Sequence, residues 1–224
     1  MIRMENLHKS YFVRGEERII ARNINVVFPT GVSVGILGRN GTGKSTLLSM
    51  IGGTMSPSSG RIISDGSISW PVGFSGSFNG ELTGAQNVRF IARVYGVDSE
   101  ELVDFVADFA EVGQQYHEPI RTYSSGMRSR LAFGLSMGVR FDTYLVDEVT
   151  GAGDARFRHK SLRLFTNRMQ QSGALFVSHG MDTLRRFCTA GAVLEDGRLT
   201  YYDDLEEAIA RHHQNLHTAE TYDD

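Results

Sequence analysis

Short apolar runs separated by polar turns occupy the first third of the chain, a pattern typical of β-strands. The runs lie at residues 2–7, 24–28, 32–37, 61–63 and 67–74. Turn signals such as Arg14-Gly15-Glu16 and Pro57-Ser58-Ser59-Gly60 stand between them. We therefore expect an N-terminal part built mainly of strands.

The period of the apolar positions changes between residues 83 and 113. Two groups of residues recur there at helical spacing: Val88, Ile91, Ala92 and Tyr95, followed by Leu102, Phe105, Val106 and Phe109. This segment predicts a small helical insertion.

Helices and strands alternate in the rest of the chain. The pattern predicts helices at residues 124–139, 154–171, 181–188 and 203–213, strands at 143–146 and 174–177, and a hairpin at 192–202. Such alternation predicts an α/β fold with a mainly parallel sheet as its core and helices on both faces. An antiparallel β part precedes this core, and the helical insertion forms a subdomain.

A glycine-rich loop follows the run at 32–37 and matches the pattern G-x-x-x-x-G-K-[ST]. Its residues are Gly38, Arg39, Asn40, Gly41, Thr42, Gly43, Lys44 and Ser45. The glycines allow backbone N–H groups to converge on one concavity, and the following helix adds its partial positive charge. Lys44 contributes a full charge, and Ser45 contributes a hydroxyl that can ligate Mg²⁺. The loop predicts a nucleoside triphosphate site rather than a turn without function.

Polar side chains follow two later apolar strands. Asp147 and Glu148 end the run at 143–146, and His179 follows the run at 174–177. Asp147 is placed to hold Mg²⁺, and Glu148 is placed to orient or deprotonate an attacking water. His179 can sense a terminal phosphate. The alternatives are an ordinary cap of the next loop for the two carboxylates and a structural histidine for His179.

Composition narrows the class of protein. The 224 residues carry a formal charge of −3, which argues against a nucleic-acid binder with a large basic face. The single cysteine, Cys188, suits a reducing compartment.

No run approaches the roughly 18 apolar residues of a membrane span, and the N-terminus lacks the order of a signal peptide, so we expect membrane association only through a partner. His212, His213 and His217 lie in a polar tail, where solvated surface is expected rather than a metal site.

A third motif, Tyr123-Ser124-Ser125-Gly126-Met127, opens the helix at 124–139. Ser124 and the N–H of Gly126 form a second anion-binding surface at a helix N-terminus, although Ser124 is also an ordinary N-cap residue. With the other motifs, the segment resembles the signature of the nucleotide-binding subunit of ATP-binding-cassette (ABC) transporters. The resemblance covers essentially the whole chain.

Membership of this family implies a role for each matching residue. Tyr11 stacks on adenine, and residues 38–45 with Thr46 form the Walker A motif. Asp147 is the Walker B carboxylate, Glu148 the catalytic glutamate, and His179 the switch histidine. Asp154 is the D-loop aspartate, and Ser124 and Gly126 contact ATP that is held by a second copy. The family also implies ATP and Mg²⁺ as cofactors and a homodimer bound to an integral-membrane permease.

The same resemblance implies one ATPase domain over residues 1–224. Its catalytic core spans about 1–82 and 140–202, its helical subdomain 83–139, and a C-terminal helix and tail 203–224. Two features depart from the family pattern. Ser125 and Met127 replace the usual Gly and Gln of the signature, and no clear Q-loop glutamine is present, because Gln86 lies too far downstream.

Several segments, including Ser67-Ile68-Ser69-Trp70-Pro71 and Asp147-Glu148-Val149, resemble ATPases that export polysaccharides. The resemblance is strongest to capsular-polysaccharide export subunits of Gram-negative bacteria, which implies a place on the cytoplasmic face of the inner membrane within the polysaccharide export machinery. The alternatives are an O-antigen or teichoic-acid exporter, a soluble cassette ATPase acting on ribosomes or DNA, and a regulatory module that binds nucleotide without hydrolysis. A GTPase is not expected, because the chain lacks an Asn-Lys-x-Asp motif.

Overall fold

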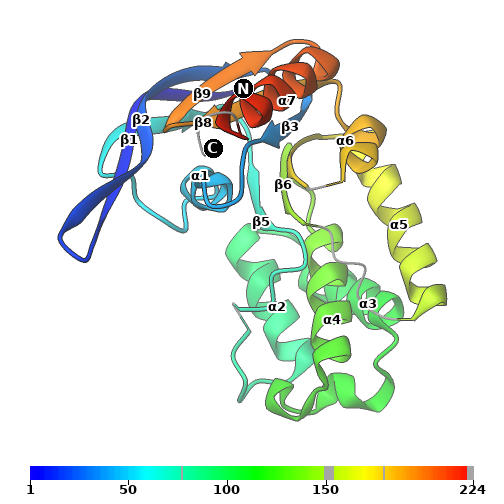
Figure 1. Ribbon diagram of the computed structural model, residues 1–224. Coiled ribbons are helices and arrows are strands. Elements are labelled where there is room, and N and C mark those ends of the chain that lie inside the picture. Colours follow the sequence, from blue (N-terminus) through cyan, green and yellow to red (C-terminus); the bar gives the residue numbers. More distant parts are fainter. Residues whose placement is uncertain (77, 149–153, 179, 221–224) are drawn as a thin grey trace. The chain divides into compact units, whose positions relative to one another are not determined.

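The computed structural model describes residues 1–76, 78–148, 154–178 and 180–220, with side chains as far as residue 216 in the last helix (Figure 1). The chain divides into two compact units. The first contains Met1–Pro71, Phe141–Glu148 and Gln171–Asp224, and the second contains Val72–Arg140 and Val149–Gln170. In the described part of the chain, no helix combines the length and the apolar character that crossing a bilayer requires.

An antiparallel sheet of three strands, in the order β2-β1-β4, confirms the predicted N-terminal β part. Its strands are β1 (Ile2–Val13), β2 (Glu16–Phe28) and β4 (Ser59–Ser64). The hairpin of β1 and β2 is longer than the predicted runs at 2–7 and 24–28, and it turns at Arg14 and Gly15. The prediction was short because β1 has no buried residue from His8 onward, so the apolar alternation ends where the hairpin leaves the core.

A six-stranded sheet in the order β5-β6-β7-β3-β8-β9 forms the centre of the first unit. Its strands are β3 (Ser33–Leu37), β5 (Ile68–Pro71), β6 (Thr143–Asp147), β7 (Gly173–Val177), β8 (Ala190–Glu195) and β9 (Arg198–Tyr202). All neighbours are parallel except β8 and β9, which confirms the mainly parallel core. The predicted strand at 67–74 was too long, since Gly73 donates its N–H to the Ser136 hydroxyl (3.2 Å) instead of to a strand.

The two faces of β3 are buried against different elements. Val34 and Ile36 belong to an apolar cluster with Leu47 and Leu48 of helix α1 (Lys44–Ile51) and with side chains of β1 and β2. Gly35, which faces the other way, lies against Leu184 of α6 (Met181–Phe187) and against helix α7 (Leu205–Glu220). Helices therefore cover both faces of this strand, as the sequence predicts.

Helix α7 corrects two expectations about the C-terminal segment. It continues to Glu220, beyond the predicted end at residue 213. His212, expected on a solvated surface, is only 8% exposed, whereas His213 is exposed. The reason is that His212 extends the buried stripe of Ala208 and Ile209 at helical spacing. Polar residues near a chain end can therefore belong to the packed face of a helix.

The second unit is helical where the structure describes it. Its α-helices are α2 (Gly84–Tyr95), α3 (Ser99–Ala110), α4 (Ser125–Gly138) and α5 (Ala155–Met169), with short 3₁₀ helices at Gly113–His117 and Ile120–Thr122. Thr83 and Gln86 form a capping box at the start of α2, and Asp98 caps α3. Phe109 stacks on Phe133 and packs edge-to-face on Phe157, which joins α3, α4 and α5. The predicted helical insertion and the two later helices are confirmed.

Candidate functional site

The glycine-rich loop joins the buried end of β3 to the start of α1. Helix α1 begins at Lys44, and its N-cap Gly43 has a left-handed conformation with φ 105° and no side-chain cap. A Cβ at Gly38 would lie 2.5 Å from the Leu194 carbonyl oxygen, so only glycine fits between the loop and β8. The loop therefore presents the uncapped N-terminus of a helix, which attracts anions.

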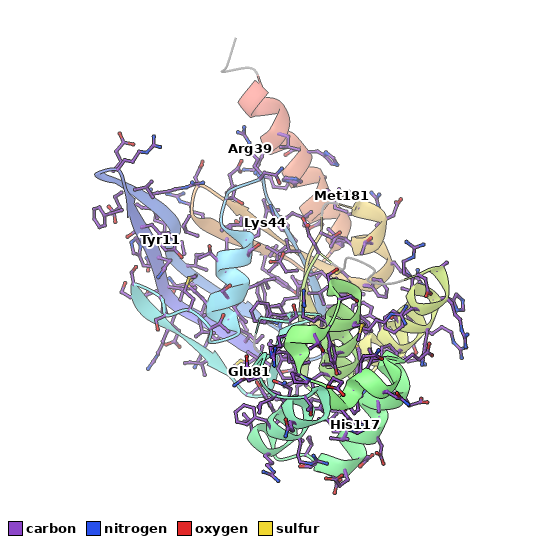
Figure 2. The ribbon with its side chains drawn as sticks, turned by 90° about the horizontal axis from the view of Figure 1, so that it is seen from below. Tyr11, Arg39, Lys44, Glu81, His117 and Met181 are labelled. Atoms are coloured by element: carbon purple, nitrogen blue, oxygen red, sulfur yellow. The ribbon has the colours of Figure 1, made fainter. Side chains whose placement is uncertain are left out.

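Lys44 is the first residue of α1 and is labelled in Figure 2. It is only 8% exposed, and its ammonium group donates to the carbonyl oxygens of Gly38 (2.7 Å) and Arg39 (3.0 Å). Burial lowers the pKa of Lys44, and the negative charges of Asp147 and Glu148 oppose part of that shift. A partly desolvated cation held this way interacts strongly with a phosphate group.

The Arg39 carbonyl oxygen is the centre of the loop's internal hydrogen bonds. Besides Lys44, it accepts from the Thr42 N–H (3.3 Å) and the Thr42 hydroxyl (3.0 Å). Arg18 of β2 donates to the Gly41 carbonyl oxygen (2.7 Å). Sequence reasoning missed Arg18, because only the fold brings β2 to this loop. Asn40 and Ser45 are exposed, and Thr46 is partly buried on the first turn of α1.

Asp147 is the last residue of β6 and Glu148 follows it, and β6 is separated from β3 by β7 alone. Since these strands are parallel, their carboxyl ends lie at one edge of the sheet together with the loop. Asp147 is partly buried, and Glu148 is exposed with φ 46°, a left-handed conformation that is uncommon for glutamate. Its N–H donates to the Val177 carbonyl oxygen (2.9 Å). Both carboxylates are near enough to Lys44 to affect its pKa, so the structure brings these predicted residues together.

His179 and residues 149–153 lie outside the described residues. Tyr11 is partly buried in β1; its hydroxyl donates to the Met55 sulfur (2.9 Å), and the Lys9 ammonium lies 5.0 Å from the ring centre. The side-chain oxygen of Gln86 accepts from the Thr83 N–H (2.9 Å), so this glutamine has a capping role in α2.

The signature residues lie in the second unit. Ser124 is the N-cap of α4, and its hydroxyl oxygen accepts from the Met127 N–H (3.2 Å). Ser124 is therefore an N-cap residue, which was the alternative given by the sequence. Its hydroxyl hydrogen can still be donated to an anion. Gly126 occupies the first turn of the same helix, where an added Cβ would approach no atom closer than 3.9 Å.

Asp154 is the N-cap of α5. It accepts from the Phe157 N–H (2.9 Å) and forms an ion pair with Arg130 (3.0 Å). Both contacts lower the pKa of Asp154, the hydrogen bond from Phe157 more than the charge of Arg130. Asp154 is therefore an ionised N-cap, and its contacts with Phe157 and Arg130 account for its position without a ligand.

Comparisons with known proteins identify the family to which the chain belongs. Residues 21–151 match the profile of a family described as ABC transporter. The chain is 49% identical to the polysialic acid transport ATP-binding protein KpsT of Escherichia coli, over 93% of this chain and 95% of that protein. It is 44% identical to the capsule polysaccharide export ATP-binding protein CtrD of Neisseria meningitidis serogroup B, over 93% and 96%. The dimeric, post-hydrolysis structure of the ATP-binding cassette MJ0796 bound to ADP and Pi has a TM-score of 0.72 at 22% identity and covers 92% of this chain and 99% of that one, which supports the fold.

Proposed function

Because this chain belongs to the ABC transporter family of ATP-binding proteins, we propose that it hydrolyses ATP to power export of a capsular polysaccharide across the inner membrane. The observation that carries the proposal is the buried Lys44 ammonium within the glycine-rich loop, close to Asp147 and Glu148. The choice of cargo follows from the relatives KpsT and CtrD, whose names describe transport of polysialic acid and export of capsule polysaccharide.

Different residues bind different parts of the nucleotide. Backbone N–H groups of the loop surround the phosphates, Lys44 neutralises their charge, and Tyr11 contacts the base. The exposed Ser45 hydroxyl and the Asp147 carboxylate are hard oxygen donors of the kind that Mg²⁺ prefers, so these two residues would hold it. When bound, Mg²⁺ neutralises negative charge on the phosphate oxygens.

Hydrolysis requires a water molecule that is in line with the terminal phosphate. Glu148 accepts a proton from this water as its oxygen bonds to the γ-phosphorus and the bond from that phosphorus to the leaving oxygen of ADP breaks. His179 donates a hydrogen bond to the γ-phosphate and stabilises the charge that develops there. The exposed position of Glu148 next to a buried strand suits a base that must reach a substrate water.

Two copies act together, each presenting Ser124 and Gly126 to ATP on the other's loop, with Asp154 near the contact between them. The MJ0796 cassette with ADP and Pi is a dimer, which supports the pairing of two copies but not the choice of these residues. ATP therefore stabilises the pair, and release of phosphate removes the contacts that closed it.

Replacing Ser124 by alanine tests the second half-site. Loss of the cap should cost about 1 kcal/mol of unfolding free energy, and ATPase activity should fall at least tenfold because the γ-phosphate loses a donor. The matched control is Thr83→Ala, which removes the N-cap of α2 in the same unit. Steady-state phosphate release and thermal unfolding measure both effects. An equal loss of activity in the two variants would show that Ser124 acts only through helix stability.

The permease is expected to dock on the helical unit and to hold the ATPase at the cytoplasmic face of the inner membrane. Helix α2 exposes Phe90 (59%) and Val94 (60%) on one face, at a spacing of four residues, and Phe74 of the same unit is half exposed. Exposed apolar side chains of this kind are typical of protein interfaces. An apolar helix from the permease would bury them.

Replacing both Phe90 and Val94 by serine should reduce the affinity for the permease by about tenfold or more, since two exposed apolar side chains lose their partner. Co-purification with the permease and permease-stimulated phosphate release are the measurements. Phe12→Ser is the control, because Phe12 is 78% exposed in the first unit. Equal binding by the double variant and the wild type would place the permease elsewhere.

The proposed function is tested in cells that lack this chain. We expect polysaccharide to accumulate inside such cells and to reach the surface again when the wild-type chain is restored. Purified with its permease, the chain should release phosphate from ATP. Surface polysaccharide at normal levels without the chain would contradict the export role, and nucleotide binding without phosphate release would favour a regulatory module.

A further inference from the structure

Strand β8 runs beside the entrance of the phosphate loop. It pairs in parallel with β3, and Leu37 is the partner of Val193. Just beyond this pair, Gly38 at the start of the loop approaches the Leu194 carbonyl oxygen so closely that no side chain fits. The next positions on the two segments are Arg39 and Glu195. The register therefore brings Glu195 beside the second residue of the loop.

The position of Arg39 matters because its peptide organises the loop. Its carbonyl oxygen accepts hydrogen bonds from the Lys44 ammonium and from both the N–H and the hydroxyl of Thr42. A shift of this peptide would move Lys44, the cation that meets the phosphates. The Arg39 side chain is exposed, so a group outside the loop can reach it.

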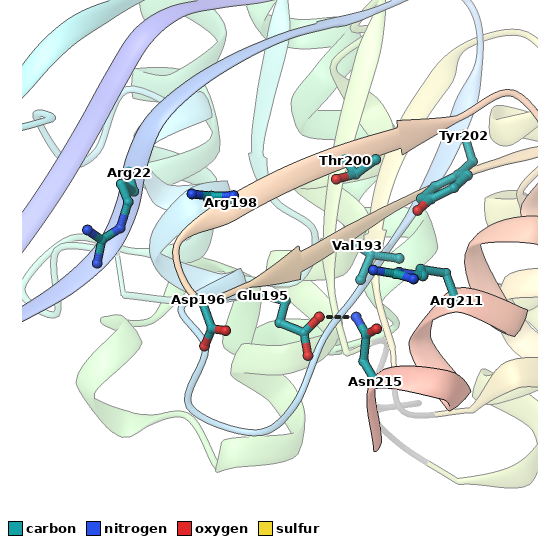
Figure 3. Close-up of a pocket in the computed structure, with 9 residues that line it drawn as sticks. All are labelled: Arg22, Val193, Glu195, Asp196, Arg198, Thr200, Tyr202, Arg211 and Asn215. Carbon is teal, nitrogen blue, oxygen red and sulfur yellow. Dashed lines mark hydrogen bonds between the residues drawn. The ribbon is translucent and has the colours of Figure 1, made fainter. Parts of the chain in front are cut away.

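Helix α7 holds Glu195 in place. The Asn215 side-chain amide donates to the Glu195 carboxylate, and the two side chains face each other in Figure 3. They line a cavity of about 460 Å³ to which Arg211 of α7 and Arg198 of β9 also contribute. Burial and Asp196 raise the pKa of Glu195, while Arg211 and Arg39 act in the opposite direction. The charge of Arg39 therefore acts on this carboxylate, although less than the charge of Arg211.

We propose that Glu195, held by Asn215, is a positioning residue for ATP binding that acts through Arg39. Its carboxylate attracts the Arg39 guanidinium and keeps the Arg39 peptide where its carbonyl oxygen supports Lys44 and Thr42. The C-terminal half of α7 thereby becomes part of the nucleotide site without touching the nucleotide. This inference rests on the proposed ATPase function.

The test compares variants of the full chain by ATP affinity, thermal unfolding and steady-state kinetics. Glu195→Gln should raise the Kd and the KM for ATP about three- to tenfold and leave kcat within about twofold, since the attraction to Arg39 is lost while an amide can keep the hydrogen bond with Asn215. Asn215→Asp places two carboxylates together and should lower both thermal stability and ATP affinity. The control Glu207→Gln removes an equal charge from an exposed position of α7 and should leave the Kd unchanged.

Two double variants separate the roles of the pair. In Glu195→Gln with Asn215→Asp the hydrogen bond re-forms with its direction reversed, so thermal stability should return while the Kd for ATP stays raised. In an Arg39→Met background, Glu195→Gln should have no further effect on the Kd. An unchanged Kd in Glu195→Gln, or fully additive effects with Arg39→Met, would overturn the inference. Failure of the wild-type chain to bind ATP would instead contradict the proposed function.

Discussion

Replacing Glu148 by glutamine should lower the rate of phosphate release by about 100- to 10,000-fold, the usual contribution of a general base. Glutamine keeps the size of the side chain but cannot accept the proton of the attacking water. ATP binding should persist, because the phosphate loop and Lys44 are unchanged. ATP should therefore hold two copies of the variant together, which light scattering with ATP and Mg²⁺ can measure.

The matched control for this variant is Glu81→Gln, which neutralises an exposed glutamate of the second unit. It should keep wild-type turnover. Undiminished phosphate release by the Glu148 variant would remove Glu148 from its assigned role. A loss of ATP binding in that variant would show instead that the carboxylate supports the loop.

Replacing Lys44 by methionine should weaken ATP binding by at least about 100-fold, since charge-assisted hydrogen bonds to phosphate are lost in a partly desolvated site. The free energy of unfolding should change much less than the free energy of ATP binding. Burial lowers the pKa of Lys44, so the protonated side chain is disfavoured in the folded protein, and methionine relieves that cost. The same change that abolishes function is therefore expected to leave thermal unfolding near the wild-type temperature.

Calorimetric titration with ATP and thermal unfolding without nucleotide measure the two properties of the Lys44 variant. Lys160→Met is the control for loss of a lysine: its ammonium pairs with Glu111 and donates to the carbonyl oxygens of Asp108 and Phe109, far along the chain from the loop. This control should lower stability and keep ATP affinity. ATP binding by Lys44→Met at the wild-type level would contradict the phosphate-binding role of the loop.

The fold was predictable from local patterns where most residues of an element are buried. Strands β3, β6 and β7 are almost wholly apolar and were found within one residue of their ends. The outer half of the β1–β2 hairpin and the last turns of α7 were missed, because no apolar alternation marks the first and polar residues continue the second. His212 shows the same effect, since its burial depends on packing of α7 and not on its own hydropathy.

The sequence by itself determined the chemistry of the phosphate loop, because its essential groups are contiguous and lie on one strand, one turn and one helix. Residues 38–45 carry the concavity, the cation and the hydroxyl within eight positions. It also determined that Asp147 and Glu148 meet this loop, since parallel strands place their carboxyl ends at one edge. Local pattern and elementary sheet geometry were sufficient for both conclusions.

Only the tertiary structure decided which distant side chains support the loop. Arg18 donates to Gly41 because β2 lies beside the loop, and Glu195 lies near the loop because β8 is the neighbour of β3. Asn215 joins them through the length of α7. These contacts depend on strand order and on helix packing. Neither strand order nor helix packing produces a periodic pattern in the sequence, so these contacts could not be predicted from it.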